Sequence, residues 1–285
     1  MGSAFAALGA IGFGIASTFA RLAYGAGATP LTLVTARTIG FVLLVGGLIL
    51  LLRQPFRLTR LGLRSLPFLG VAGFFMSVGY LSAVAYIPVS LAVLLLYTGP
   101  FMVGLISAAT GRESLTAPKL VALVVAFLGL ALAIGPEASA LDPRGIAWAL
   151  AAALAIALQT VFARSILHEN KPLVLNWYAH LALLPLLLVF GPLVGSYAIP
   201  QGLDGLGGAG GSILGYILGY VCWFLALTRI AAIRVALVFN LEPLVTFAAA
   251  ALLLGERLTL QQSLGSALVL AAIIGQSLWR ERAAR

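Results

Sequence analysis

Ten stretches of the sequence are apolar for roughly 20 residues each, which is the length that a helix needs to cross a lipid bilayer. A bilayer offers no water to unpaired peptide groups, so a chain crosses it as helices or as a closed barrel, and runs of this length are typical of helices. The sequence therefore predicts an all-α membrane protein with ten transmembrane helices. The ten runs are Ala4–Tyr24, Pro30–Leu52, Leu66–Ile87, Val89–Ala109, Pro118–Ile134, Gly145–Leu167, Pro172–Val194, Gly211–Leu227, Val235–Leu254 and Leu260–Trp279.

The composition agrees with this class and argues against several others. Hydrophobic residues make up 62% of the 285 residues, and charged residues only 9%. One cysteine, Cys222, and two distant histidines, His168 and His180, are too few for a disulfide framework or a typical zinc site. We expect no metal and no cofactor, and no nucleotide-binding loop of the Gly-x-x-x-x-Gly-Lys-Ser/Thr type occurs.

The net charge of +9 comes from arginines and lysines at the ends of the apolar runs, which indicates signals for membrane topology and no nucleic-acid partner. With the N-terminus placed in the cytoplasm, 13 of the 17 Lys and Arg residues fall on the cytoplasmic side. This bias predicts both termini inside, a cytoplasmic loop at Arg53–Arg64 and an outer loop at Tyr197–Gly210. We expect a multi-pass protein of the bacterial inner membrane.

The same pattern occurs twice in the chain, 143 positions apart. Pro100 and Glu113 match Pro243 and Glu256, and Phe19-Ala20-Arg21 matches Phe162-Ala163-Arg164. We interpret this as a duplication, with repeats at residues 1–140 and 141–285. Because each repeat holds five helices, the second is inverted relative to the first. Inverted repeats are the architecture of secondary transporters, with the substrate site at the interface between the repeats.

A carboxylate and a proline stand together inside the ninth run, at Glu242-Pro243. Both are costly in hydrocarbon, so the pair indicates a site. Pro100 and Pro243 are predicted to break their helices and to act in gating. Glu242 is interpreted as a cation or proton site, because burial favours a neutral carboxyl group. The alternative is a structural role, in which Glu242 caps backbone donors beside Pro243.

These residues also carry a resemblance to a known family. The motifs are Asn240-Leu241-Glu242-Pro243, Gly255-Glu256-Arg257-Leu258-Thr259 and Leu264-Gly265-Ser266-Ala267-Leu268, with Tyr97-Thr98-Gly99-Pro100-Phe101 and Gly111-Arg112-Glu113-Ser114-Leu115-Thr116 in the first half. The chain resembles the EamA-type branch of the drug/metabolite transporter superfamily. The resemblance implies a basket of ten helices, with helices 1, 3, 4, 6, 8 and 9 around a central cavity and helices 5 and 10 outside. Thr98 and Gly99 occupy the positions of Leu241 and Glu242, so a role for Glu242 is not symmetric.

Several polar and aromatic residues lie in the middle of helices that the resemblance places around the cavity. The predicted substrate-binding residues are Ser77, Tyr80, Tyr97, Gln159, Trp223 and Asn240. Packing and interhelical hydrogen bonds are the alternative for each of them. For a zwitterionic substrate, Asn240 and Gln159 are expected to hold the carboxylate, and backbone carbonyls freed near the two prolines are expected to hold the ammonium group.

Two further ionisable residues, Arg37 and His180, are expected at the membrane surfaces and not in the substrate site. Arg37 lies about two helical turns from an outer end and is expected to snorkel to the membrane surface. His180 is expected near the inner surface.

Glycines spaced by four at Gly211, Gly215 and Gly219 are expected to serve close helix packing within one chain, with helices 5 and 10 as a possible homodimer seam. We therefore predict a monomer or a homodimer.

The predicted function is export of neutral, aromatic or otherwise apolar amino acids by alternating access, with a small molecule and the lipid bilayer as partners. One alternative is export of drugs or other metabolites. An integral-membrane enzyme acting on lipid is the alternative of another class. The sequence disfavours it, because such an enzyme needs a cluster of acidic or histidine residues at one interface and the sequence has none.

Overall fold

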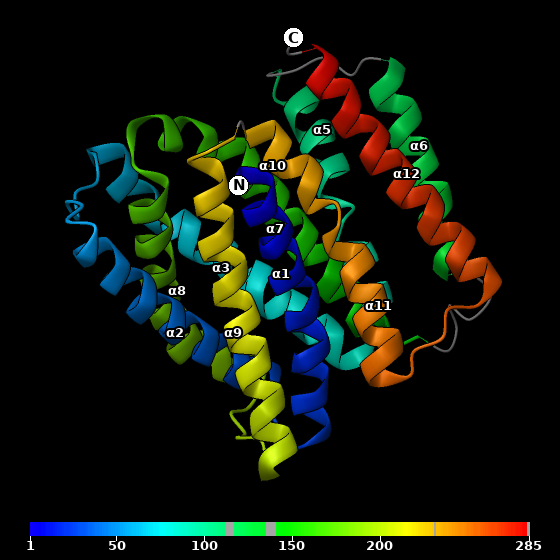
Figure 1. Cartoon of the computed structure of the whole chain (residues 1–285), viewed down its shortest axis with the longest axis horizontal. Helices are drawn as coiled ribbons and strands as arrows, with labels where there is room; N and C mark the ends of the chain where they lie inside the picture. The colour runs from blue at the N-terminus through cyan, green and yellow to red at the C-terminus, as the bar shows by residue number, and fades with distance from the viewer. Residues whose placement is uncertain (112–116, 135–140, 231, 284–285) are drawn as a thin grey trace.

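The computed structural model describes residues 1–111, 117–134, 141–230 and 232–283, and these segments fold as twelve α-helices without a β-strand (Figure 1). The helices are α1 Gly2–Gly25, α2 Pro30–Leu51, α3 Arg60–Tyr86, α4 Val89–Leu96, α5 Gly99–Ala109, α6 Ala117–Ile134, α7 Pro143–Glu169, α8 Pro172–Val194, α9 Gly202–Leu227, α10 Ala232–Phe239, α11 Glu242–Leu254 and α12 Leu260–Ala283. The pairs α4/α5 and α10/α11 are each the two halves of one span. The described helices therefore form the ten spans that the sequence predicts.

Seven spans of the described segments are long and apolar enough to cross a membrane by themselves, and the other three contain the shorter apolar helices Leu120–Ala133, Glu242–Leu254 and Leu260–Gly275. The predicted all-α membrane fold is confirmed. The boundary between the repeats at residue 140 stays a prediction, and Glu113 of the repeated motif lies outside the described residues.

Prolines explain where the two broken spans break. Pro100 and Pro243 are each the second residue of their helix, α5 and α11. A proline ring clashes with the carbonyl group four residues earlier, and that position is Leu96 before Pro100 and Phe239 before Pro243. Leu96 and Phe239 are the last residues of α4 and α10. The predicted helix breaks are therefore present, and the role in gating stays a prediction.

Two loops are shorter than the sequence predicts, because the neighbouring helices begin earlier. α3 starts at Arg60, where the Thr59 hydroxyl accepts a hydrogen bond from the Gly62 backbone nitrogen at 3.2 Å and caps the helix. α9 starts at Gly202. The predicted loops Arg53–Arg64 and Tyr197–Gly210 are thus partly helical, and the connections are residues 52–59 and 195–201.

The contacts between helices, together with the correspondence of the two halves, arrange the ten spans in three groups, and α2 and α8 also contact each other across the first two. Bundle A consists of α1, α2, α9, α10 and α11, and bundle B consists of α3, α4, α5, α7 and α8. The α6/α12 pair lies at one edge of the molecule (Figure 1). The principal pairs are α1 with α9 and α3 with α7, so each bundle combines helices from both halves of the chain. The two halves of the chain pair symmetrically: α1 packs on α9 as its counterpart α7 packs on α3, and α6 packs on its counterpart α12.

Glycines allow the α1 and α9 backbones to touch. A Cβ atom added at Gly12 would lie 2.7 Å from the Gly215 carbonyl oxygen, and one added at Gly215 would lie 2.7 Å from the Gly12 carbonyl oxygen. Similarly, a Cβ atom at Gly129 of α6 would lie 2.8 Å from the carbonyl oxygen of Gly265 in α12. Small residues in these helices serve packing within one chain.

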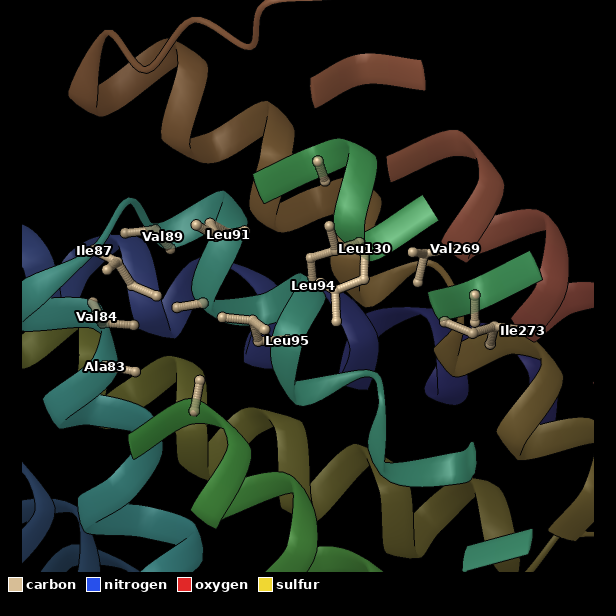
Figure 2. Close-up of a cluster of buried hydrophobic side chains, with 14 of the residues drawn as sticks. Ala83, Val84, Ile87, Val89, Leu91, Leu94, Leu95, Leu130, Val269 and Ile273 are labelled. Atoms are coloured by element: carbon tan, nitrogen blue, oxygen red, sulfur yellow. The ribbon is translucent and has the colours of Figure 1, made fainter. Parts of the chain in front are cut away.

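The largest apolar cluster joins the edge pair to bundle B. Figure 2 shows Val84 and Ile87 at the end of α3, Leu94 and Leu95 on α4, and Leu130, Val269 and Ile273 from α6 and α12. All of these side chains are at least nine-tenths buried. The cluster holds α4 in place directly before its break at Tyr97.

Candidate functional site

A cavity of about 300 Å³ lies between bundles A and B. Bundle A contributes Phe13, Ala16, Ser17, Arg37, Tyr216, Tyr220 and Glu242 to its wall. Bundle B contributes Met76, Ser77, Tyr80, Leu96, Tyr97, Pro100 and Ile156. The wall is mostly apolar and aromatic, and its two charged groups both come from bundle A.

Five of the residues that the sequence singles out meet at this cavity. They are Ser77, Tyr80, Tyr97, Pro100 and Glu242. Ser77 and Tyr80 lie three residues apart on α3 and therefore share one face of the helix. Their role in substrate binding stays a prediction, but the structure brings their side chains together.

The remaining four candidates lie elsewhere. Gln159 lines a small adjoining pocket of about 30 Å³ that shares Met76, Ser77 and Tyr220 with the main cavity. Trp223 is half-buried and packs edge-to-face against Tyr220 and Phe224. Asn240 and Pro243 are buried but are not part of the cavity wall.

The Tyr97 hydroxyl bridges the two bundles at the cavity. It lies 3.0 Å from Oε2 of Glu242 and 3.2 Å from the backbone oxygen of Phe239. Phe239 is the residue whose carbonyl Pro243 deprives of its helical partner. A tyrosine hydroxyl has a single proton, so it can donate to one of these two oxygens at a time. The freed carbonyl expected to bind an ammonium group thus shares the Tyr97 hydroxyl with the Glu242 carboxyl group.

The expectation that Arg37 snorkels to the membrane surface is wrong. Its side chain is only 8% exposed and lines the cavity. The guanidinium carbon lies 3.9 Å from the centroid of the Tyr216 ring, which supplies a cation–π contact. α2 packs against α8 and α9, so the arginine points into the protein and finds an aromatic partner there.

The expectation of a surface position for His180 is also wrong. His180 is 7% exposed, and its ring stacks on Phe41 with centroids 3.8 Å apart. Nδ1 lies 2.8 Å from the Asn176 carbonyl oxygen, and Nε2 lies 2.8 Å from the Tyr216 hydroxyl. Because the carbonyl can only accept, Nδ1–H donates to it and, in the neutral ring, Nε2 accepts from Tyr216. His180 therefore fixes the tyrosine that contacts Arg37.

Sequence reasoning also missed most of the aromatic wall. The Tyr220 ring packs edge-to-face with Phe13 and Tyr216, with centroids 5.0 Å and 4.9 Å apart. Such pairs stabilise packing beyond the area they bury. The signal that was available is the spacing of four between Tyr216 and Tyr220, in the same helix as the spaced glycines.

Comparisons with known proteins agree with this architecture. The model of the EamA-like transporter family matches residues 1–135 and 143–278. An uncharacterized transporter of Archaeoglobus fulgidus is 30% identical over 196 residues, which is 66% of this chain and 67% of that protein. A probable amino-acid metabolite efflux pump of Salmonella typhimurium is 32% identical over 198 residues, 65% of this chain and 66% of that protein. One solved crystal structure covers 98% of both chains with a TM-score of 0.64 at 20% identity, a likeness of fold alone.

Proposed function

Because the chain belongs to the EamA-like transporter family, we propose that it exports neutral, aromatic or otherwise apolar amino acids, or metabolites like them, across the bacterial inner membrane. Membership makes it a multi-pass membrane transporter of small molecules. The substrate class, the direction and the transport cycle are our proposal. Its substrate-binding residues are Ser77, Tyr80, Tyr97 and Glu242.

The cavity between the two bundles is the observation that carries the proposal. Its volume of about 300 Å³ lies at the lower end of the range for small-molecule sites, which suits a single small solute. Aromatic and apolar walls with few polar groups suit an apolar side chain attached to a polar head. The name of the Salmonella typhimurium relative, a probable amino-acid metabolite efflux pump, supports the same class.

Alternating access would be a movement of bundle A against bundle B. The cavity lies between these bundles, whereas each repeat of the sequence contributes helices to both of them. The Tyr97 contact to Glu242 and Phe239 crosses the interface and would break when the bundles part. This proposal differs from a movement of one sequence repeat against the other.

Transport by the purified protein in liposomes tests the proposed function. Labelled phenylalanine and leucine are expected to exchange across the membrane, and Tyr80→Ala is expected to abolish exchange while the protein still purifies. Trp223→Ala is the matched control, because Trp223 is aromatic and mid-helix but outside the cavity wall. Exchange of none of the amino acids would reject the substrate class. Loss of exchange in both variants alike would reject the cavity as its location.

Export of drugs or other metabolites is the second candidate. The apolar wall favours it, because such a wall accepts many shapes of apolar ligand. In the same liposomes, inhibition of phenylalanine exchange by structurally unrelated compounds would support this candidate.

A further inference from the structure

Arg37 lies on the cavity wall as a buried cation without a carboxylate partner. It is more than nine-tenths buried, and among the described residues it makes a cation–π contact with Tyr216 and no ion pair. Glu242, the other charged group of the wall, has Tyr97 as its partner. Arg37 and Glu242 therefore both line the cavity, and neither is the counter-ion of the other.

An arginine in this position is expensive for a membrane protein. A buried charge is tolerated when it is paired or when it serves a substrate pathway. The guanidinium group carries five N–H donors in a planar fork, and the Tyr216 ring satisfies none of them as an acceptor oxygen would. The donors of Arg37 that face the cavity are thus available to an acceptor inside it.

We propose that Arg37 is the anchor for a carboxylate of the transported molecule, which narrows the proposed function to substrates that carry this group and rests on that function. A carboxylate accepts two parallel N–H bonds from a guanidinium group, and such bidentate pairs are strong and directional. The hydrogen bonds of His180 to Asn176 and Tyr216 hold the ring beneath the arginine in place. Arg37 is therefore the proposed carboxylate-binding group. It takes the place of Gln159 and Asn240, which lie outside the cavity wall.

The second charged side chain of the wall suits the ammonium group of such a substrate. Glu242 offers a carboxyl group to an ammonium group, so a zwitterion in the cavity can contact both Arg37 and Glu242, which line it. An amine without a carboxylate leaves Arg37 unpaired, and a cationic drug also brings a like charge into the same cavity. The cavity is expected to discriminate against both.

Competition against labelled phenylalanine in wild-type liposomes is the first test. Phenethylamine and phenylalanine amide keep the ring and the amine but lack the carboxylate. Each is expected to compete at least tenfold more weakly than unlabelled phenylalanine, because a charge-assisted bidentate bond is lost. Equal competition by either compound would overturn the anchor.

Variants of Arg37 give the second test. Arg37→Gln is expected to raise the KM for phenylalanine at least tenfold and to remove the preference over the amide, and Arg37→Lys is expected to retain part of that preference. Arg144→Gln is the matched control, since Arg144 is exposed and paired with Asp142. A wild-type KM and preference in Arg37→Gln would overturn the proposal.

Thermal unfolding of the same variants separates binding from structure. Removing a buried cation that lacks a counter-ion should leave the Tm of the empty protein unchanged or raise it, while the KM for phenylalanine rises. A lowered Tm with unchanged substrate preference would indicate a structural role and contradict the anchor. If Arg37→Gln does not fold, the competition data and Arg37→Lys decide the question. If the wild-type protein moves no amino acid, the proposed function itself is wrong and the anchor falls with it.

Discussion

The hydroxyl group of Tyr97 contacts two oxygens beside the break at Pro243, Phe239 O and Glu242 Oε2. The first lacks a helical donor because proline has no N–H, and the second is a carboxyl group buried in the membrane region. Tyr97 of bundle B therefore contacts both α10 and α11, the two halves of the broken span in bundle A. At the scale of single residues, this contact joins the two bundles at the cavity, as the bond between His180 and Tyr216 also does.

Replacing Tyr97 by Phe removes this hydroxyl and keeps the ring. We expect a loss of about 1 kcal/mol in the free energy of unfolding, typical of one hydrogen bond, and roughly fivefold slower amino-acid exchange. Tyr178→Phe is the matched control, because its hydroxyl donates to the Phe56 carbonyl oxygen at 3.2 Å away from the cavity. It should lose similar stability and keep its transport rate. Equal slowing of transport in both variants would contradict a role at the cavity.

Residues were predictable from sequence where position along a helix decides their surroundings. Ser77 and Tyr80 share one face of a helix that the family resemblance places at the cavity, and both line it. Arg37 and His180 were misplaced because their partner is Tyr216, from another part of the chain. A charge near the end of a helix snorkels unless a distant helix supplies such a partner, and sequence order does not disclose that.

At the scale of helices, the sequence identifies which spans break, because Pro100 and Pro243 stand inside apolar runs. The last residues before each break follow from the geometry of proline. The sequence does not reveal which group caps the opposite end of α4, its N-terminus at Val89. For α4 that group is Glu256, which follows α11: its carboxylate accepts from the backbone nitrogens of Val89 and Ser90 at 2.8 Å and 3.2 Å.

Glu256→Gln is expected to lower the free energy of unfolding by about 1–2 kcal/mol, because it removes a charged acceptor from a helix N-terminus and from the Ser90 hydroxyl at 2.8 Å. Asp204→Asn is the control, since Asp204 lies exposed in the first turn of α9. It should cost less than about 0.5 kcal/mol. Chemical unfolding in detergent measures both values, and equal losses would argue against the cap.

The contact between α1 and α9 gives a second prediction for helices. Gly215→Ala places a methyl group against the Gly12 backbone and is expected to destabilise the protein by about 1–3 kcal/mol. Gly210, on the same helix, has no atom within 4 Å of an added Cβ. Gly210→Ala should therefore be neutral or mildly stabilising. Thermal unfolding compares the two variants, and equal Tm values would show that α1 and α9 can move apart without a loss of stability.

For the whole molecule, contacts between loops assign the loops to two sides. The backbone nitrogen of Gln201 donates to the Ala26 carbonyl oxygen at 2.8 Å, which joins the α8–α9 and α1–α2 connections. Asn170 accepts from the backbone nitrogen of Thr59 at 2.8 Å and joins the α7–α8 and α2–α3 connections. These contacts fit the alternation of ten spans. Which side faces the cytoplasm follows from the arginines and stays a prediction.

Single cysteines test this orientation in a Cys222→Ala background. Ser196→Cys, in the predicted outer connection, should react with a membrane-impermeant thiol reagent in intact cells. Arg57→Cys, in the predicted inner connection, should react only after the cells are permeabilised. Both positions are exposed, so a difference reflects the membrane and not burial. Labelling in the opposite order would place both termini outside.

The pairing of helices from opposite halves of the chain affects the order in which the protein can assemble. α1 leaves the ribosome well before its main partner α9, which begins only at Gly202. α3 likewise must await α7. The glycine-lined face of α1 therefore lacks its partner helix until the second half of the chain has been made. Final assembly depends on contacts between distant parts of the chain, which form slowly. Mutations at the α1–α9 contact should consequently lower the yield of inserted protein before they alter any rate of transport.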